Sequence, residues 1–135
     1  MPPPQFILST DPILAPSLDF AAEEGAEAQF LGAVRGHEEG QPIAGIDYSA
    51  YLPMVEKTLR EITDRALIEH GEHRVLIQHR LGFVAVREPS ILIRVWTKHS
   101  AQAFDMCRWY LKEIKTSVPI WKRIVPVNSM RPSAI

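Results

Sequence analysis

Apolar residues recur at helical spacing in two long stretches of the chain. The first starts at Pro53, which suits a first helical turn, and should end near Gly71. The second covers Ala101 to about Thr116, with Ser100 as its expected N-cap and Pro119 preventing continuation. A shorter helix is predicted from the segment LDFAAEE within residues 10–24. The two long stripes consist of Val55, Leu59, Ile62 and Ala66, and of Ala103, Cys107, Tyr110 and Ile114.

Short runs rich in apolar and β-branched residues predict strands between these helices. They lie at Gln5–Ser9, Ala26–Arg35, Ile43–Tyr51, Arg74–Arg80, Ile91–Lys98 and Ile120–Val127. The segment GHEEGQP separates the second strand from the third, and we expect these two strands to pair as a long hairpin. Because strands come in pairs between helices, the pattern predicts a single α+β domain, with a mixed or antiparallel sheet and helices packed on it.

The composition is that of an ordinary globular domain. The 135 residues are 46% hydrophobic and 23% charged, with a net charge of −1, which argues against a nucleic-acid coat protein. No apolar run approaches the roughly 18 residues of a membrane span, and the start MPPPQFILSTDP does not read as a signal peptide. Cys107 is the single cysteine, so no intrachain disulfide can form, and we expect a cytoplasmic protein.

Common catalytic and metal-binding motifs are absent from the sequence. It has no P-loop, no dinucleotide-binding glycine fingerprint, no CxxC and no HExxH. His70 and His73 are three residues apart, but no third ligand is evident, so we interpret them as a solvated helix end rather than a metal site. Cys107 falls on an apolar helical stripe and is interpreted as a core residue rather than a nucleophile. We therefore expect neither a metal nor a cofactor.

The segment KTSVPIWKR at 115–123 is the most informative one for chemistry. Lys115 falls in the last turn of a helix, where the helix dipole favours a charged ammonium, and Lys122 falls in the strand that follows. Together with Arg123 and Arg35, the lysines could form a pocket for a phosphate or carboxylate. Spacing alone favours a pair of surface lysines.

His99 lies between a predicted strand and a predicted helix. Such a junction places a side chain beside backbone N–H groups that attract anions. Spacing alone favours a polar loop histidine at this position. For Arg35, which ends a largely apolar strand, an exposed strand-end arginine is an equally good interpretation.

Five segments between Gly25 and Arg123 resemble the large, catalytic subunit of molybdopterin synthase, the MoaE-type family. They are FLGAVRGHEEG at 30–40, YSAYLPMVEKTLREI at 48–62, HRLGFVAVREPSI at 79–91, KHSAQAF at 98–104 and LKEIKTSVPIWKR at 111–123. The resemblance implies an α/β hammerhead-type fold in one domain over 1–135. We assign 1–24 to an N-terminal strand and short helix, and 124–135 to a divergent C-terminal tail.

The resemblance also implies a sulfurtransferase of molybdenum cofactor biosynthesis. That family converts cyclic pyranopterin monophosphate into molybdopterin, with sulfur from the C-terminal thiocarboxylate of a small ubiquitin-like (MoaD-type) subunit. Its large subunit is a homodimer with one small subunit on each end, which implies a heterotetramer. We expect no nucleic-acid or membrane partner. Because Cys107 is interpreted as structural, the sulfur must come from a partner.

By the same resemblance, Lys115 and Lys122 match the family's two active-site lysines. Arg35 and His99 match the residues that would hold the phosphate and the pterin. The remaining positions assigned to substrate binding are Ala33, Val34, Ser100, Arg123 and Ile124. In the family such a pocket draws on both protomers.

The sequence departs from the family pattern at several of these positions. Ser100 stands where the family usually has arginine, and Ile124 where it usually has glutamate. Gly36-His37 follows Arg35 where a small polar residue is frequent, and the C-terminal stretch reads VPVNSMRPSAI. These departures motivate an alternative hypothesis, in which the protein is a non-catalytic paralogue that binds the ubiquitin-like subunit but not the pterin.

Overall fold

The computed structural model describes residues 1–127. The helices are α1 (Leu52–His70) and α2 (Ser100–Ser117). The strands are β1 (Gln5–Ser9), β2 (Ala26–Ala33), β3 (His37–Glu38), β4 (Gln41–Ala50), β5 (Arg74–Arg80), β6 (Gly82–Ala85), β7 (Pro89–Thr97) and β8 (Ile120–Pro126). Both long helices and the predicted strands are confirmed, whereas β3 and β6 were not predicted. The start of the predicted C-terminal tail, Ile124–Pro126, belongs to β8, and residues 128–135 lie outside the described part of the chain.

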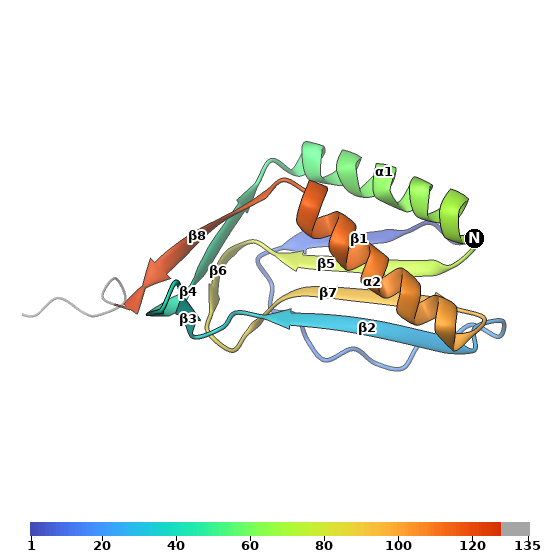
Figure 1. Cartoon of the computed structure of the whole chain (residues 1–135), viewed down its shortest axis with the longest axis horizontal. Helices are drawn as coiled ribbons and strands as arrows, with labels where there is room; N and C mark the ends of the chain where they lie inside the picture. The colour runs from blue at the N-terminus through green and yellow to red at the C-terminus, as the bar shows by residue number, and fades with distance from the viewer. Residues whose placement is uncertain (128–135) are drawn as a thin grey trace, which may run out of the picture.

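The larger sheet has the strand order β1-β5-β7-β2 and carries both helices on one face (Figure 1). Strands β1 and β5 are parallel and the other pairs antiparallel, so the predicted mixed sheet is confirmed. The predicted apolar stripes of α1 and α2 are buried against this sheet. Between them lies the main core, which includes Leu59, Ile77, Ile93 and Tyr110.

The segment between β1 and β2 crosses the other face of this sheet and forms no helix. The predicted short helix at 18–24 is therefore wrong. The guanidinium of Arg74 donates to the Asp19 carbonyl at 2.7 Å, and that of Arg94 donates to the Ser17 carbonyl at 2.9 Å. Arginines of the sheet thus form hydrogen bonds to carbonyls of this segment. This segment between β1 and β2 is held as an extended strap, and its own Ile13 is buried.

The second, smaller sheet has the order β3-β4-β6, and β8 also pairs with β4. The predicted long hairpin between residues 26–35 and 43–51 is wrong, because β2 pairs with β7 instead. The pairing of β2 shifts in register at Ala33, and the chain then enters a tight hairpin of β3 with β4. Its two turn residues, Glu39 and Gly40, have φ of 52° and 77°, which suits a two-residue turn. Strand β4 therefore pairs with the adjacent β3.

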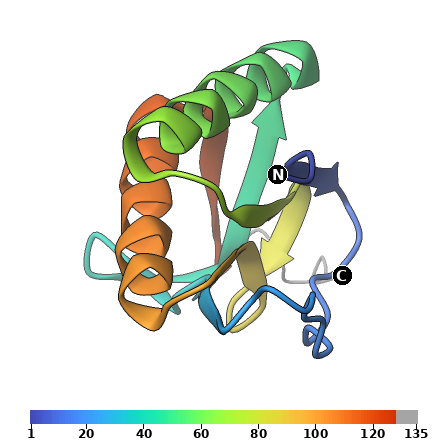
Figure 2. The same cartoon turned by 90° about the vertical axis from the view of Figure 1, so that its right-hand side faces the viewer.

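The end of α2 and the start of β8 are separated only by Val118 and Pro119. Strand β8 then runs antiparallel to β4, with Ile120 opposite Ala50 and Lys122 opposite Tyr48. Figure 2 shows β4 and β8 side by side behind the two helices. This connection places the last turn of α2 beside the second sheet, and it positions the site described next.

Candidate functional site

A cavity of about 260 Å³ lies where the last turn of α2 meets β4, β5, β7 and β8. Its walls are partly apolar, with Ile91, Ile114 and Ile120 among the lining side chains. Its polar members are Tyr48, His79, Ser90, Lys115 and Lys122. The structure therefore brings together the two lysines that the sequence singled out and adds three polar groups that it did not.

The two lysines reach this cavity from different elements. Lys115 follows the buried Ile114 in the last turn of α2 and is exposed. Lys122 is exposed on β8 and lies opposite Tyr48 of β4, on the same face of that strand pair. The sharp connection at Pro119 turns the chain back, so that both ammonium groups border one opening.

His79 is the most constrained polar group of the cavity. A carbonyl oxygen only accepts hydrogen bonds, so Nδ1 of His79 donates to the Arg80 carbonyl at 2.7 Å, which leaves the Nε2 lone pair available in the neutral ring. The ring meets Tyr48 edge-on, with 4.8 Å between centroids. Burial lowers the pKa of His79, with the hydrogen bond to the carbonyl acting in the opposite direction. The imidazole is therefore neutral at pH 7.

The electrostatic character of the cavity favours an anion. Lys115 and Lys122 border it, and none of the described residues that line it is acidic. Ammonium groups beside an apolar wall bind carboxylates, thiocarboxylates or phosphates, and they stabilise negative charge that develops on an oxygen. The arrangement is suited to acyl or phosphoryl chemistry.

His99 and Ser100 lie at the opposite end of α2 from Lys115. Lys115 follows His99 by sixteen positions along the helix, which is about 24 Å at 1.5 Å per residue. Both residues are exposed. The prediction that Ser100 caps the helix is wrong by one residue, because the N-cap is His99 and the helix begins at Ser100 without a side-chain cap hydrogen bond. Within one chain, neither residue shares the cavity of the lysines.

Arg35 also lies outside the cavity of its own chain. It follows β2, its side chain is 81% exposed, and it approaches Glu38 at 3.7 Å. A contact of that length between a highly exposed arginine and a carboxylate contributes little to stability. The guanidinium is thus available to a ligand or to another chain.

The other residues assigned to substrate binding surround the smaller sheet. Val34 is buried in a second core with Ile43, Ile46 and Val84, against which Ile124 packs, and the adjacent Ala33 is exposed. Arg123 lies on the opposite face of β8 from Lys122 and donates to the Asp47 carboxylate at 2.9 Å. Their substrate-binding role stays a prediction, and the single chain does not place these side chains among those that line the cavity.

Sequence reasoning missed Tyr48, His79 and Ser90. A signal for His79 was present, because Val75, Ile77 and His79 alternate along one strand and the first two are core residues. A histidine at the next core-facing position is a polar group that needs a partner or a function. Tyr48 is similarly two residues from the buried Ile46 on β4.

His73 is buried, which corrects its interpretation as part of a solvated helix end. Its Nδ1 donates to the Gly71 carbonyl at 2.8 Å, and the Tyr110 hydroxyl donates to Nε2 at 2.6 Å. Burial lowers the pKa of His73 and raises that of Tyr110. Over residues 1–127, no three His, Cys, Asp or Glu side chains are grouped as metal ligands.

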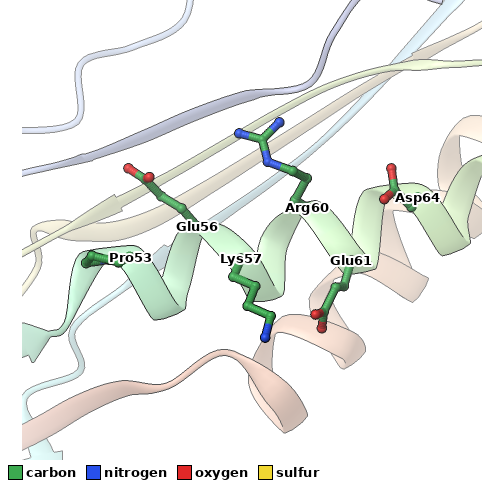
Figure 3. A pocket seen from close by; sticks show the side chains of 6 residues that line it. All are labelled: Pro53, Glu56, Lys57, Arg60, Glu61 and Asp64. Atoms are coloured by element: carbon green, nitrogen blue, oxygen red, sulfur yellow. The ribbon is translucent and has the colours of Figure 1, made fainter.

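The outer face of α1 carries a shallow hollow lined by Pro53, Glu56, Lys57, Arg60, Glu61 and Asp64. Figure 3 shows these side chains projecting to both sides of the helix rather than converging. All are exposed, and they carry charges of both signs, as on a solvated helix face. Neither α1 nor α2 is apolar enough over sufficient length to cross a membrane, in the part of the chain that the structure describes.

Comparison with known proteins extends these observations. The molybdopterin synthase catalytic subunit of Arabidopsis thaliana is 40% identical over 108 residues, which are 80% of this chain and 54% of the plant protein. The protein of the same name from Synechococcus elongatus is 37% identical over 122 residues, which are 87% of this chain and 74% of the relative. This chain thus spans about half the length of the Arabidopsis relative and more of the cyanobacterial one.

Solved structures share the fold. A crystal structure of molybdopterin synthase from Staphylococcus aureus matches with a TM-score of 0.83 at 30% identity, over 90% of each chain. A complex of subunits 1 and 2 of molybdopterin-converting factor from Helicobacter pylori has the same fold, with a TM-score of 0.67 at 19% identity. The family model described as MoaE protein matches residues 8–117, most of the described chain. Because this match covers well over half of the sequence, this chain belongs to the MoaE family.

Proposed function

We propose that this protein is the catalytic subunit of a molybdopterin synthase. It would transfer sulfur from the C-terminal thiocarboxylate of a small ubiquitin-like subunit to cyclic pyranopterin monophosphate, which yields molybdopterin. The main observation behind this proposal is the cavity that Lys115 and Lys122 border, whose described lining residues include no carboxylate. The names of the similar proteins support the same reaction.

The cavity suits the end of an extended peptide tail. A thiocarboxylate is an anion, and the two ammonium groups attract it to the opening. Its sulfur attacks the pterin side chain and joins the tail to it through a thioester. When water then adds to the acyl carbon, Lys115 and Lys122 stabilise the negative charge on the acyl oxygen until the sulfur leaves. Two rounds with an exchange of tails supply both sulfurs of the dithiolene.

Cys107 does not serve as the sulfur carrier in this proposal. Its thiol is buried on the core side of α2, and burial raises its pKa, so the reactive thiolate is disfavoured. The sulfur therefore comes from a MoaD-type partner. The Helicobacter pylori structure, a complex of subunits 1 and 2 of molybdopterin-converting factor, supports such a partner. With one cysteine and no intrachain disulfide, the protein suits a reducing cytoplasm.

A homodimer would complete the site. The cavity of one chain, about 260 Å³, falls below the ~300–1,000 Å³ of sites that enclose drug-sized ligands. Arg35, His99 and Ser100 are exposed and do not line the cavity of their own chain. We therefore propose that these residues hold the phosphate and pterin at the cavity of the second protomer. One small subunit on each end then gives the heterotetramer.

Reconstitution tests this function directly. The protein is mixed with a thiocarboxylated small subunit and cyclic pyranopterin monophosphate, and the dithiolene product is assayed. Product formation supports the synthase. Tight binding of the small subunit without pterin binding or product would instead support the non-catalytic paralogue, for which Ser100 and Ile124 are the motivating residues.

A further inference from the structure

His79 is a second chemical group of the cavity, and the role of the lysines leaves it unused. It occupies the core-facing row of β5 after Val75 and Ile77, at the point where that row reaches the cavity. The hydrogen bond from Nδ1 to the Arg80 carbonyl fixes the ring orientation, and Tyr48 packs against the ring edge-on. A basic nitrogen is thus held beside the two ammonium groups.

We propose that His79 is the general base of the reaction and accepts a proton at Nε2 from the water that releases the acyl group of the small subunit. This inference rests on the proposed function and adds a step to it. Attack by the thiocarboxylate sulfur joins the tail to the substrate through a thioester. That thioester must be hydrolysed before the tail can leave and the sulfur can stay on the substrate.

The step balances without an oxidant or a reductant. The water oxygen forms a bond to the acyl carbon, and its proton passes to Nε2 of His79. The acyl carbon–sulfur bond then breaks, and its electron pair leaves with the sulfur as a thiolate on the substrate. Lys115 and Lys122 stabilise the intermediate oxyanion. The imidazolium returns its proton to the thiolate or to solvent, and the tail departs as a carboxylate.

The other polar groups of the cavity are poorer bases. An ammonium has three donors and no lone pair, so the cations that stabilise an oxyanion cannot also accept a proton. The Ser90 hydroxyl is directed to the Gly32 carbonyl at 3.5 Å. A neutral imidazole is the usual proton acceptor near neutral pH. Burial, which lowers the pKa of His79, keeps its Nε2 in the accepting form.

The substitution His79→Gln tests the proposal, because glutamine keeps a hydrogen-bonding atom near the position of Nε2 but cannot accept a proton. We expect product formation to slow by about 100-fold, the lower range of general-base catalysis. Intact-mass spectrometry should show the small subunit accumulating as a covalent thioester adduct with the substrate. The matched control is His37→Gln, which alters an exposed histidine on β3.

The pH dependence supplies a readout that a structural role of His79 would not change. The titratable or charged side chains that face His79 across the cavity are Tyr48, Lys115 and Lys122. In the wild-type protein, protonation of His79 should slow hydrolysis and increase the amount of adduct as the pH falls below 6.5. In His79→Gln, the rate of hydrolysis and the amount of adduct should not change with pH in this way. The wild-type measurement holds even if the variant folds poorly, which thermal unfolding and small-subunit binding would reveal.

The outcomes separate this inference from the proposed function. Wild-type product together with an unchanged rate, adduct level and pH profile in His79→Gln overturns the role of His79 and leaves the synthase standing. A wild-type adduct level that does not respond to pH also overturns it. If the wild-type protein binds the small subunit and makes neither product nor adduct, the proposed function and this inference both fall.

Discussion

Lys122 of β8 lies directly opposite Tyr48 of β4, and both border the cavity that Lys115 reaches from the last turn of α2. The two lysines are seven positions apart in the sequence, and the turn at Pro119 brings them to one opening. Antiparallel pairing with β4 then adds the phenol ring that packs on His79.

Replacing Lys115 with alanine should lower product formation by at least about 100-fold, the scale for loss of one oxyanion-stabilising donor. The side chain is exposed, so the free energy of unfolding should change by no more than about 0.5 kcal/mol. Single-turnover product assays and urea unfolding check the two statements. Lys112→Ala is the matched control, since Lys112 is exposed on the same helix and does not line the cavity. Full activity in Lys115→Ala would contradict the proposed mechanism.

Replacing Ser100 with arginine should strengthen substrate binding if the start of α2 serves the cavity of a second protomer. An added guanidinium can form charge-assisted hydrogen bonds to a phosphate, and we expect KM to fall by about tenfold at an unchanged kcat. The comparison is Ala101→Arg, which places the same charge at the next exposed position of α2. Equal effects of both variants would indicate general electrostatic attraction rather than a specific contact.

Removing the guanidinium of Arg94 should strongly destabilise the protein. Arg94 Nε donates to Glu27 at 2.8 Å, and the side chains are only 8% and 7% exposed. Arg94→Ala leaves a buried carboxylate without its partner and releases the Ser17 carbonyl of the strap, which we expect to cost about 3–5 kcal/mol. Chemical denaturation measures this loss. Arg123→Ala breaks an exposed pair with Asp47 and should cost about 1 kcal/mol or less, and equal losses would contradict the prediction.

Stability should fall in two stages as the pH decreases. Burial lowers the pKa of both His73 and His79 below the ordinary value of 6.5, so the unfolded chain binds these protons more readily and stability begins to fall below about pH 6.5. Hydrogen bonds from Arg74 lower the pKa of Glu24 below its ordinary value of 4.5, against the effect of burial. The stability from that pair is present above pH 4.5 and is lost as the pH falls through the lowered pKa.

Urea unfolding between pH 8 and pH 3 measures both stages. Glu24→Gln should reduce the lower stage without abolishing it, because the pKa of Glu27 is also lowered, and it should leave the upper stage unchanged. His37→Gln should leave both stages unchanged, because that histidine is exposed on β3. A single loss of stability confined below pH 4.5 would show that neutral His73 and His79 do not contribute as expected.

Much of the secondary structure could be predicted from the sequence. The apolar residues of α1 and α2 recur at helical spacing because one face of each helix is buried. This spacing can be recognised within each segment alone. The pairing of the strands was harder to predict from the sequence. The hairpin expected between residues 26–35 and 43–51 does not form, because β7 is the partner of β2 and the turn at Glu39–Gly40 gives β4 a closer one. The helix expected at 18–24 is replaced by a strap because Arg74 and Arg94, distant in sequence, bind its carbonyls.

Some features of the candidate site could likewise be predicted from the sequence, and others could not. By itself, the sequence determined the two lysines, the proline between them and the buried character of Cys107, since each depends on the period or chemistry of one short segment. Only the tertiary structure placed His79 and Tyr48 beside Lys115. The physical reason is that a cavity forms where several elements meet. Which elements meet is decided by strand pairing and packing between residues far apart in the chain, and no local period encodes those contacts.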